Sequence, residues 1–243
     1  MSNAAQLPHP AARRRDLLLA GAGALAVLTS GRRAAAVQAD AAVEHEPATP
    51  FDMAQFLARG NDLAKRFVKD GSAVGQDRYL HALAALAVRL ANVPVPEMKA
   101  QSTPGYEIGF NPGGDPFTVL HWRLAPGAVI RDHVHAYGNV VTLVLEGDVR
   151  IRNHEMVGTR DYGARGTFRV RRTCEAFLRP GGINLVSLER DYIHGFQAGP
   201  SGARGLDITT RILERRPTPV LEIAKEPVDA ARGVYEASWT GSD

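Results

Sequence analysis

The sequence predicts a mainly β protein in which strands form a barrel or sandwich after a short helical segment. From Gly105 onward, short apolar runs alternate with turn signals such as Asn111-Pro112-Gly113-Gly114 and Pro180-Gly181-Gly182. Before that point, apolar residues recur at helical spacing. With 44% apolar and 23% charged residues, the 243-residue chain has the composition of a globular protein that buries one main core.

The first 39 residues have the pattern of an export signal. Three arginines, Arg13 to Arg15, precede Asp16 and three leucines, and an apolar run then extends to Leu28 before small residues up to Ala39. The apolar run is about a dozen residues, whereas a permanent membrane helix needs about 20, so we expect no lasting anchor. Cleavage is expected after Ala39 or near Ala36, and residues 40–50 are expected to form a linker.

The paired arginines before Asp16 resemble the twin-arginine export motif. This resemblance implies transport by the twin-arginine machinery and a periplasmic or secreted protein. A disordered basic tail is the alternative interpretation.

Charge and cysteine content argue against nucleic-acid binding and against a fold held by disulfides or a cysteine zinc site. Five of the 29 Lys and Arg residues and one of the 26 Asp and Glu residues lie in the first 39, so the remainder carries 24 basic against 25 acidic side chains. A net charge of −1 does not favour nucleic acid as a partner. Cys174 is the one cysteine, so the chain has neither an internal disulfide nor a CxxC zinc site, and we expect a buried small hydrophobe.

Residues 51–104 are predicted to form a helical lead-in. Asp52 is a candidate cap for a helix in which Met53, Phe56 and Leu57 recur at helical spacing. A second helix is predicted over 76–91 with leucines on one face. His81, near its start, is expected to lie at the surface or to pack, because no other ligand type accompanies it.

The region 105–215 is predicted to form the barrel, and 216–243 a tail of mixed pattern. The candidate strands are 116–125, 130–134, 139–146, 148–153, 166–171, 174–179, 183–189, 192–198 and 204–213. Two sheets rolled together enclose a pocket lined by alternate residues, which in small barrels holds one ligand or metal.

Three histidines are the candidate ligands of one metal ion. His133 and His135 are two apart on a predicted strand and so point to the same side. His194, on a later strand, is the candidate third ligand. His154 follows a polar hairpin and is expected to be solvated.

The run from Gly127 to Gly147 resembles the first motif of the cupin superfamily, G(x)5HxH(x)3–4E(x)6G. Gly127, His133, His135 and Gly147 match it, but the glutamate position holds Asn139 or Val140. A three-histidine site without that acid resembles the cysteine dioxygenase-like thiol dioxygenases, over about residues 105–213. The resemblance implies a double-stranded β-helix, or jelly-roll, barrel with a helical N-terminal segment, and iron(II) as cofactor.

The implied activity is oxidation of a small thiol by O₂ to a sulfinate. Three neutral imidazoles leave the full charge on the ion and leave adjacent positions open, so that a thiolate and dioxygen have room to bind side by side. One alternative is a cupin enzyme for a non-thiol substrate that uses iron, zinc, nickel or manganese. Another is a metal- or small-molecule-binding cupin without turnover. A homo-oligomer is compatible with each.

Four further residues are candidates for roles beside the metal. Arg123 shares a predicted face with His121, and Arg211 shares one with Asp207, so Arg123, Arg211 and His121 are candidate substrate-binding residues. Tyr192, two before His194, is a candidate catalytic hydroxyl. The alternatives are surface ion pairs for the arginines and packing for the tyrosine. No arginine lies in 106–109, where the amino-acid thiol dioxygenases carry a carboxylate clamp, so the substrate need not be cysteine.

Overall fold

The computed structural model describes residues 49–67, 70–112, 116–163, 165–214 and 217–242. The predicted export signal and most of the predicted linker lie outside these ranges. Within them, no helix combines the length and apolar character needed to cross a membrane.

Two helices precede the strands, as predicted. Helix α1 (Met53–Phe67) begins with a reciprocal cap: the Asp52 carboxylate accepts from the Gln55 N–H at 2.7 Å, and the Gln55 amide oxygen accepts from the Asp52 N–H at 3.3 Å. Helix α2 (Ala73–Ala87) begins where the Ser72 hydroxyl accepts from the Gly75 N–H at 3.1 Å. Both ends of α2 lie a few residues before the predicted ones.

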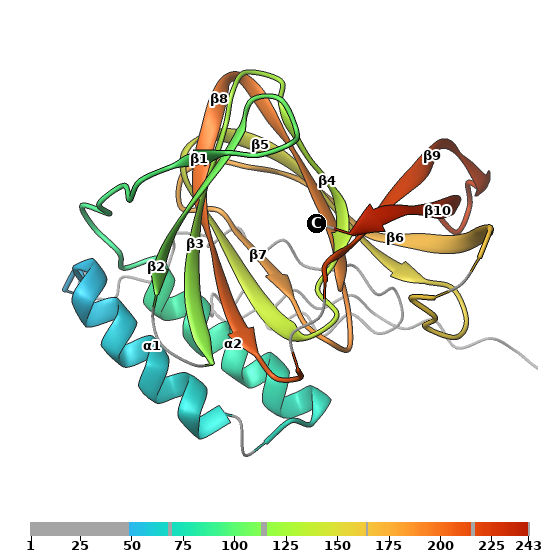
Figure 1. Cartoon of the computed structure of the whole chain (residues 1–243). Coiled ribbons are helices and arrows are strands. Elements are labelled where there is room, and N and C mark those ends of the chain that lie inside the picture. The colour runs from blue at the N-terminus through green and yellow to red at the C-terminus, as the bar shows by residue number, and fades with distance from the viewer. Residues whose placement is uncertain (1–48, 68–69, 113–115, 164, 215–216, 243) are drawn as a thin grey trace, which may run out of the picture. The chain divides into compact units, whose positions relative to one another are not determined.

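The described residues after α2 form strands almost throughout. The strands are β1 (Lys99–Ala100), β2 (Tyr106–Pro112), β3 (Phe117–Leu124), β4 (Val129–Val134), β5 (Gly138–Met156), β6 (Thr167–Leu178), β7 (Ile183–Val186), β8 (Ile193–Arg211), β9 (Pro219–Asp229) and β10 (Val234–Ser242). Strands β5, β6 and β8 each join two predicted strands into one. The predicted mainly β barrel with an N-terminal helical segment is confirmed (Figure 1).

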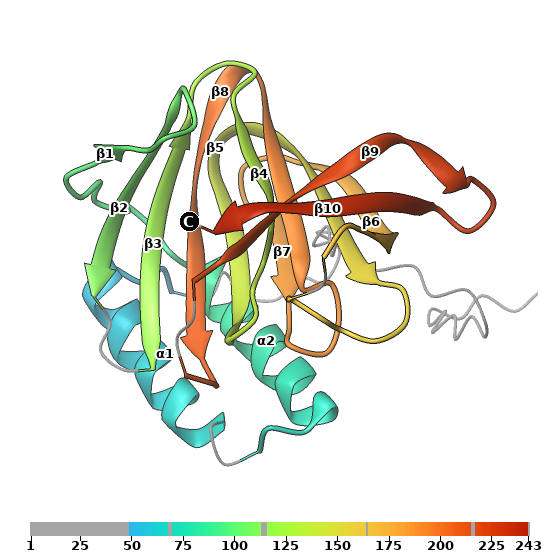
Figure 2. The same cartoon turned by 45° about the vertical axis from the view of Figure 1, so that its right-hand side comes forward.

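The two longest strands each pass through both walls of the barrel. Residues 203–210 of β8 pair with β3, whereas 193–197 pair with β4. Residues 140–143 of β5 pair with β7, whereas 149–156 pair with β6. The chain bends between the halves at Gly147 and Gly202, whose φ values of +69° and +74° favour glycine. We call the wall of β2, β3, β7 and the adjoining halves of β8 and β5 the first sheet, and the wall of β4, β6 and the other halves the second sheet (Figure 2).

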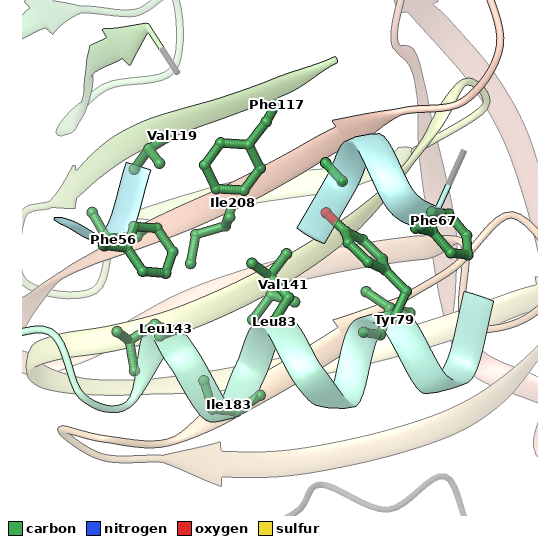
Figure 3. Packing of buried hydrophobic residues seen from close by; sticks show 14 of the residues in the cluster. Phe56, Phe67, Tyr79, Leu83, Phe117, Val119, Val141, Leu143, Ile183 and Ile208 are labelled. Carbon is green, nitrogen blue, oxygen red and sulfur yellow. The ribbon is translucent and has the colours of Figure 1, made fainter. Parts of the chain in front are cut away.

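The helices cover the outer face of the first sheet. Phe56 of α1 and Leu83 of α2 are fully buried against side chains from four strands of that sheet, among them Phe117 and Ile208 (Figure 3). Phe56 and Phe117 stack at a tilt with ring centroids 5.9 Å apart.

The barrel interior is apolar at one end. Trp122 and Val144 from the first sheet pack with Ile130, Ile151 and Phe196 from the second, and all but Ile130, at 7% exposure, are almost fully buried. Side chains alternate along each strand, so residues two away from these also face the interior.

The predicted tail contains a β-hairpin. Strand β9 pairs with β10, β10 pairs with β6, and β9 meets β4 where Val220 lies opposite His133. Leu221, Tyr235 and Ala237 pack with Val134 and Ile193, on the outer face of the second sheet. The tail is thus a structured extension of that sheet, which its mixed pattern did not predict.

Candidate metal centre

A bulge in β4 directs His133 into the barrel. Ile130 lies opposite Phe196 and His133 opposite His194 on β8, so the segment between them holds one residue more than its partner strand. Ile130 and His133 therefore both face inward although three positions separate them. Regular alternation resumes after the bulge, so Val134 packs on the outer face and His135 faces inward.

The three predicted ligands converge. The Nε2 atoms of His133 and His135 are 3.1 Å apart, those of His135 and His194 are 2.8 Å apart, and those of His194 and His133 are 3.1 Å apart. Within the described residues they form a group that fits one metal ion, and no carboxylate belongs to it.

Two observations favour metal binding by these imidazoles. The Nδ1 of His133 lies 2.9 Å from the Arg131 carbonyl, so Nδ1 carries the N–H and Nε2 carries the lone pair that can ligate a metal. Burial, and then the neighbouring histidines, hold the pKa of His135 and of His194 well below the ordinary value, so both are neutral at pH 7. Three mutually close ring nitrogens cannot all satisfy one another by hydrogen bonds, but they can share one cation.

The nitrogen separations fit one class of coordination. Three nitrogens about 2.1 Å from an ion at right angles lie about 3.0 Å apart, whereas tetrahedral angles would place them about 3.4 Å apart. The observed 2.8 to 3.1 Å match the right-angle arrangement, which would leave room for further ligands on a bound ion. The donor set therefore fits a mononuclear divalent transition metal.

An apolar side chain occupies the position at which the cupin motif carries its acid. Val140 is fully buried and lies opposite Thr209 and Val186, and its outer-facing neighbour Val141 packs against the helices. Asn139 accepts a hydrogen bond from the Leu188 N–H at 3.1 Å instead of facing the histidines. The chain thus supplies no anionic ligand from this segment.

Polar side chains line the interior beside the histidines. Asn153 of β5 lies opposite His194 and donates to the Asn184 side chain of β7 at 2.8 Å, which links the two sheets. On the first sheet, Thr142 lies between Asn184 and Asp207, and its hydroxyl donates to the Asp207 carboxylate at 2.7 Å.

Burial raises the pKa of Asp207 to about 6, although the Thr142 hydrogen bond and the Trp122 indole lower it. The indole N–H faces this carboxyl without reaching hydrogen-bonding geometry. Asp207 is thus a buried acid whose pKa lies close to neutral pH.

Asp132 lies on the opposite side of β4, within the bulge. Its carboxylate is 3.3 Å from the Arg152 guanidinium and 3.8 Å from Nδ1 of His154. Gly195 faces it, and a Cβ at Gly195 would lie 2.7 Å from an Asp132 oxygen. His154 is only 2% exposed, and burial lowers its pKa to about 3, so the expectation of a solvated His154 was wrong.

The structure does not bring Arg123 and His121 to the histidines. Both share the face of β3 that carries Phe117 and Val119 toward the helices, whereas Trp122 faces the interior. Arg123 pairs with Glu107 at 3.0 Å and borders a surface pocket of about 460 Å³ that no metal-ligand candidate lines. Nε2 of His121 pairs with the Asn111 side chain, and burial lowers the pKa of His121 to about 4.

Tyr192 also faces away from the triad. Its hydroxyl accepts from the Met156 N–H at 2.7 Å, and its ring packs with Val134 under the Arg160 guanidinium, 4.2 Å away. Strand β8 begins only at Ile193, after Asp191 at a φ of +57°, so alternation cannot be extended back from His194. Arg211 shares the inner face of β8 with Asp207, as predicted, four residues further along the strand. Cys174 is buried, as predicted.

Sequence reasoning missed the interior amides and the bulge acid. Asn153 and Asn184 belong to no recognisable motif, and only strand register places them near His194. Asp132 is adjacent to His133 in sequence, but only the bulge shows that its side chain lies on the other side of β4, beside Arg152 and His154.

Comparisons with known proteins give matches among solved structures alone: no family model matches the chain, and no curated protein does. KdgF from Halomonas sp. is 16% identical with a TM-score of 0.36, over 49% of this chain and 87% of that one. An uncharacterized conserved protein with a double-stranded β-helix domain from Klebsiella pneumoniae is 18% identical with a TM-score of 0.34, over 46% and 78%. The Cnp3 cupin domain of Schizosaccharomyces pombe is 12% identical with a TM-score of 0.36, over 49% and 70%.

Proposed function

We propose that the chain is a mononuclear non-heme iron dioxygenase that oxidises a small thiol to a sulfinate. The observation that carries this proposal is the triad of imidazoles, with Nε2 separations of 2.8 to 3.1 Å and no carboxylate in the group. A carboxylate ligand would offset part of the charge on the ion, whereas three imidazoles leave it available to attract a thiolate.

Iron(II), when bound, supplies the redox chemistry that lets dioxygen react with the thiol. In the overall reaction both oxygen atoms become bonded to sulfur. Sulfur loses four electrons, these electrons reduce dioxygen, and the single proton of the thiol is released to solvent because the product is the ionised sulfinate. No other oxidant is needed.

The chain's own residues hold and enclose the reactants. His133, His135 and His194 fix the ion, and the apolar end of the barrel around Trp122 and Phe196 excludes water from one side. The interior amides and Asp207 remain as the polar groups from which substrate recognition can be built.

One experiment tests the activity. We expect purified mature protein to hold about one iron per chain by elemental analysis and to consume O₂ with one or more of 2-mercaptoethanol, cysteine, 3-mercaptopropionate, cysteamine and sulfide. His194→Ala should lose both iron and oxygen uptake, because the two remaining imidazoles are too few to hold the ion. The matched control is His81→Ala, an exposed helix residue that should keep both.

Two outcomes would contradict the proposal. Silence of iron-loaded protein across the thiol panel would end the thiol dioxygenase hypothesis and favour a cupin enzyme for another substrate. Stoichiometric zinc, nickel or manganese without oxygen uptake would favour a non-redox enzyme or a binding protein.

We further propose that the protein is exported by the twin-arginine machinery. The support is the pair Arg14-Arg15 before Asp16 and the uncharged apolar run that follows. Replacing Arg14 and Arg15 together with Lys should retain the precursor inside the cell, measured by fractionation and immunoblotting. Unchanged export of that variant would show that another route carries the protein.

A further inference from the structure

Two buried asparagine side chains form a bridge inside the barrel next to the third ligand. Asn153 is 2% exposed and Asn184 4% exposed, and they are joined by one hydrogen bond of 2.8 Å. Asn153 lies directly opposite His194 on the neighbouring strand, as Ile151 lies opposite Phe196 two residues further along. Directly opposed side chains on one face have Cβ atoms about 5 Å apart, so a molecule at the triad next to His194 also meets this amide pair.

The amide pair is only half satisfied. Within the part of the chain that the structure describes, the side-chain oxygen of Asn153 and the side-chain nitrogen of Asn184 have no hydrogen-bond partner. Exchanging oxygen and nitrogen in both amides preserves the bridge and moves the free acceptor to Asn184 and the free donor to Asn153. In either assignment the pair presents one free acceptor and one free donor, and leaving both unmet in a buried site is costly.

A buried acid on the same wall disfavours anions near the amide pair. Asp207 is buried on the same inner wall, one strand beyond Thr142, and makes no ion pair among the described residues. Its carboxylate repels a second negative group in this low-dielectric interior. A group that both donates and accepts a hydrogen bond, and carries no negative charge, matches the amide pair.

We propose that Asn153 and Asn184 recognise the uncharged polar group, a hydroxyl or a primary amide, of a small thiol held at the three histidines. This inference rests on the proposed thiol chemistry and names the substrate class of the same site. The free amide acceptor receives the hydrogen bond of that group, and the free amide donor bonds to its oxygen.

Binding of thiols to cobalt(II)-loaded protein tests the proposal without turnover. Thiolate coordination changes the cobalt absorption spectrum, and each titration yields an affinity. The probes are 2-mercaptoethanol, which has the hydroxyl, ethanethiol, which lacks it, and the charged 3-mercaptopropionate and cysteamine. We expect 2-mercaptoethanol to bind about tenfold more tightly than ethanethiol, since two net hydrogen bonds supply about that factor, and more tightly than either charged thiol.

A variant pair locates the effect. Asn153→Leu combined with Asn184→Leu removes both amides together, so neither is left unpaired. In this variant 2-mercaptoethanol and ethanethiol should bind with about equal affinity. The matched control is Asn139→Leu on the same strand, a buried asparagine that bonds the Leu188 N–H and should keep the preference. If the double variant does not fold, the wild-type thiol series alone decides.

The outcomes separate this inference from the function on which it rests. If no thiol changes the cobalt spectrum, the proposed thiol chemistry fails. If ethanethiol binds as tightly as 2-mercaptoethanol, the site accepts thiols but the amides hold only water, and the inference is overturned. Tightest binding of a charged thiol would overturn it equally.

Discussion

At the scale of single residues, Asp207 makes the stability of the metal-free protein depend on pH. Burial raises its folded pKa from 3.8 to about 6. The folded state therefore favours the protonated carboxyl, and ionising Asp207 lowers the unfolding free energy. This loss of stability is absent below about pH 4, grows as the pH rises toward 6, and is complete above pH 6. The difference corresponds to about 3 kcal/mol at pH 7.

Asp207→Asn should remove this dependence. The amide keeps an oxygen that accepts from the Thr142 hydroxyl but never ionises. Between pH 4 and pH 7, we expect the unfolding free energy of the metal-free wild type to fall relative to the variant by about 3 kcal/mol, measured by urea titration at each pH. Parallel curves for the two proteins would show that Asp207 does not titrate in this range.

The metal ligands could be predicted from the sequence, whereas the residues around them could not. The HxH spacing needs only local strand geometry, and the structure brings His133, His135 and His194 together. Predictions for neighbouring residues depended on which face of a strand is inside. Arg123 lies on the helix-facing side of β3, and the turn at Asp191 breaks the alternation that was assumed for Tyr192.

At the scale of elements, the β4 bulge and the glycine opposite it set the position of His133. Gly195→Ala would place a Cβ 2.7 Å from an Asp132 oxygen and 3.1 Å from the Asp132 backbone nitrogen. Backbone cannot move aside as a flexible side chain does, so the bulge must shift and carry His133 with it. We expect metal affinity to fall about tenfold or more, with about 1 to 3 kcal/mol of lost stability, measured by metal titration and chemical unfolding.

The control is Gly71→Ala in the turn between the helices, where an added Cβ meets nothing within 4 Å. It should leave metal affinity unchanged. Wild-type affinity in Gly195→Ala would mean that the bulge does not position His133.

Element prediction succeeded where burial follows a local pattern. Both helices show apolar residues at helical spacing, and most barrel strands are bounded by turn signals. Strands β5 and β8 were each divided because Gly147 and Gly202 resemble turns, although they only bend a continuous strand. The β9–β10 hairpin was missed because its apolar face is buried by a distant partner: Leu221 and Tyr235 pack on the second sheet.

At the scale of the whole barrel, the helices and the metal ligands lie on different walls. Helices α1 and α2 pack on the outer face of the first sheet, whereas His133, His135 and His194 project from the second. The hydroxyls of Tyr79 on α2 and Thr210 on β8 form a buried hydrogen bond between the helix layer and the barrel. The helices therefore stabilise the wall opposite the ligands without supplying a ligand.

Leu83→Ala separates stability from metal binding. Leu83 is fully buried between α2 and the first sheet, so its loss leaves a cavity and should lower the unfolding free energy by about 2 to 5 kcal/mol. The ligands on the opposite wall keep their positions in molecules that remain folded, so metal affinity well below the midpoint of unfolding should match that of wild type. Thermal unfolding and metal titration measure the two quantities, with the exposed Val74→Ala on the same helix as control. A large loss of metal affinity in folded Leu83→Ala would instead mean that helix packing is transmitted through the interior to the histidines.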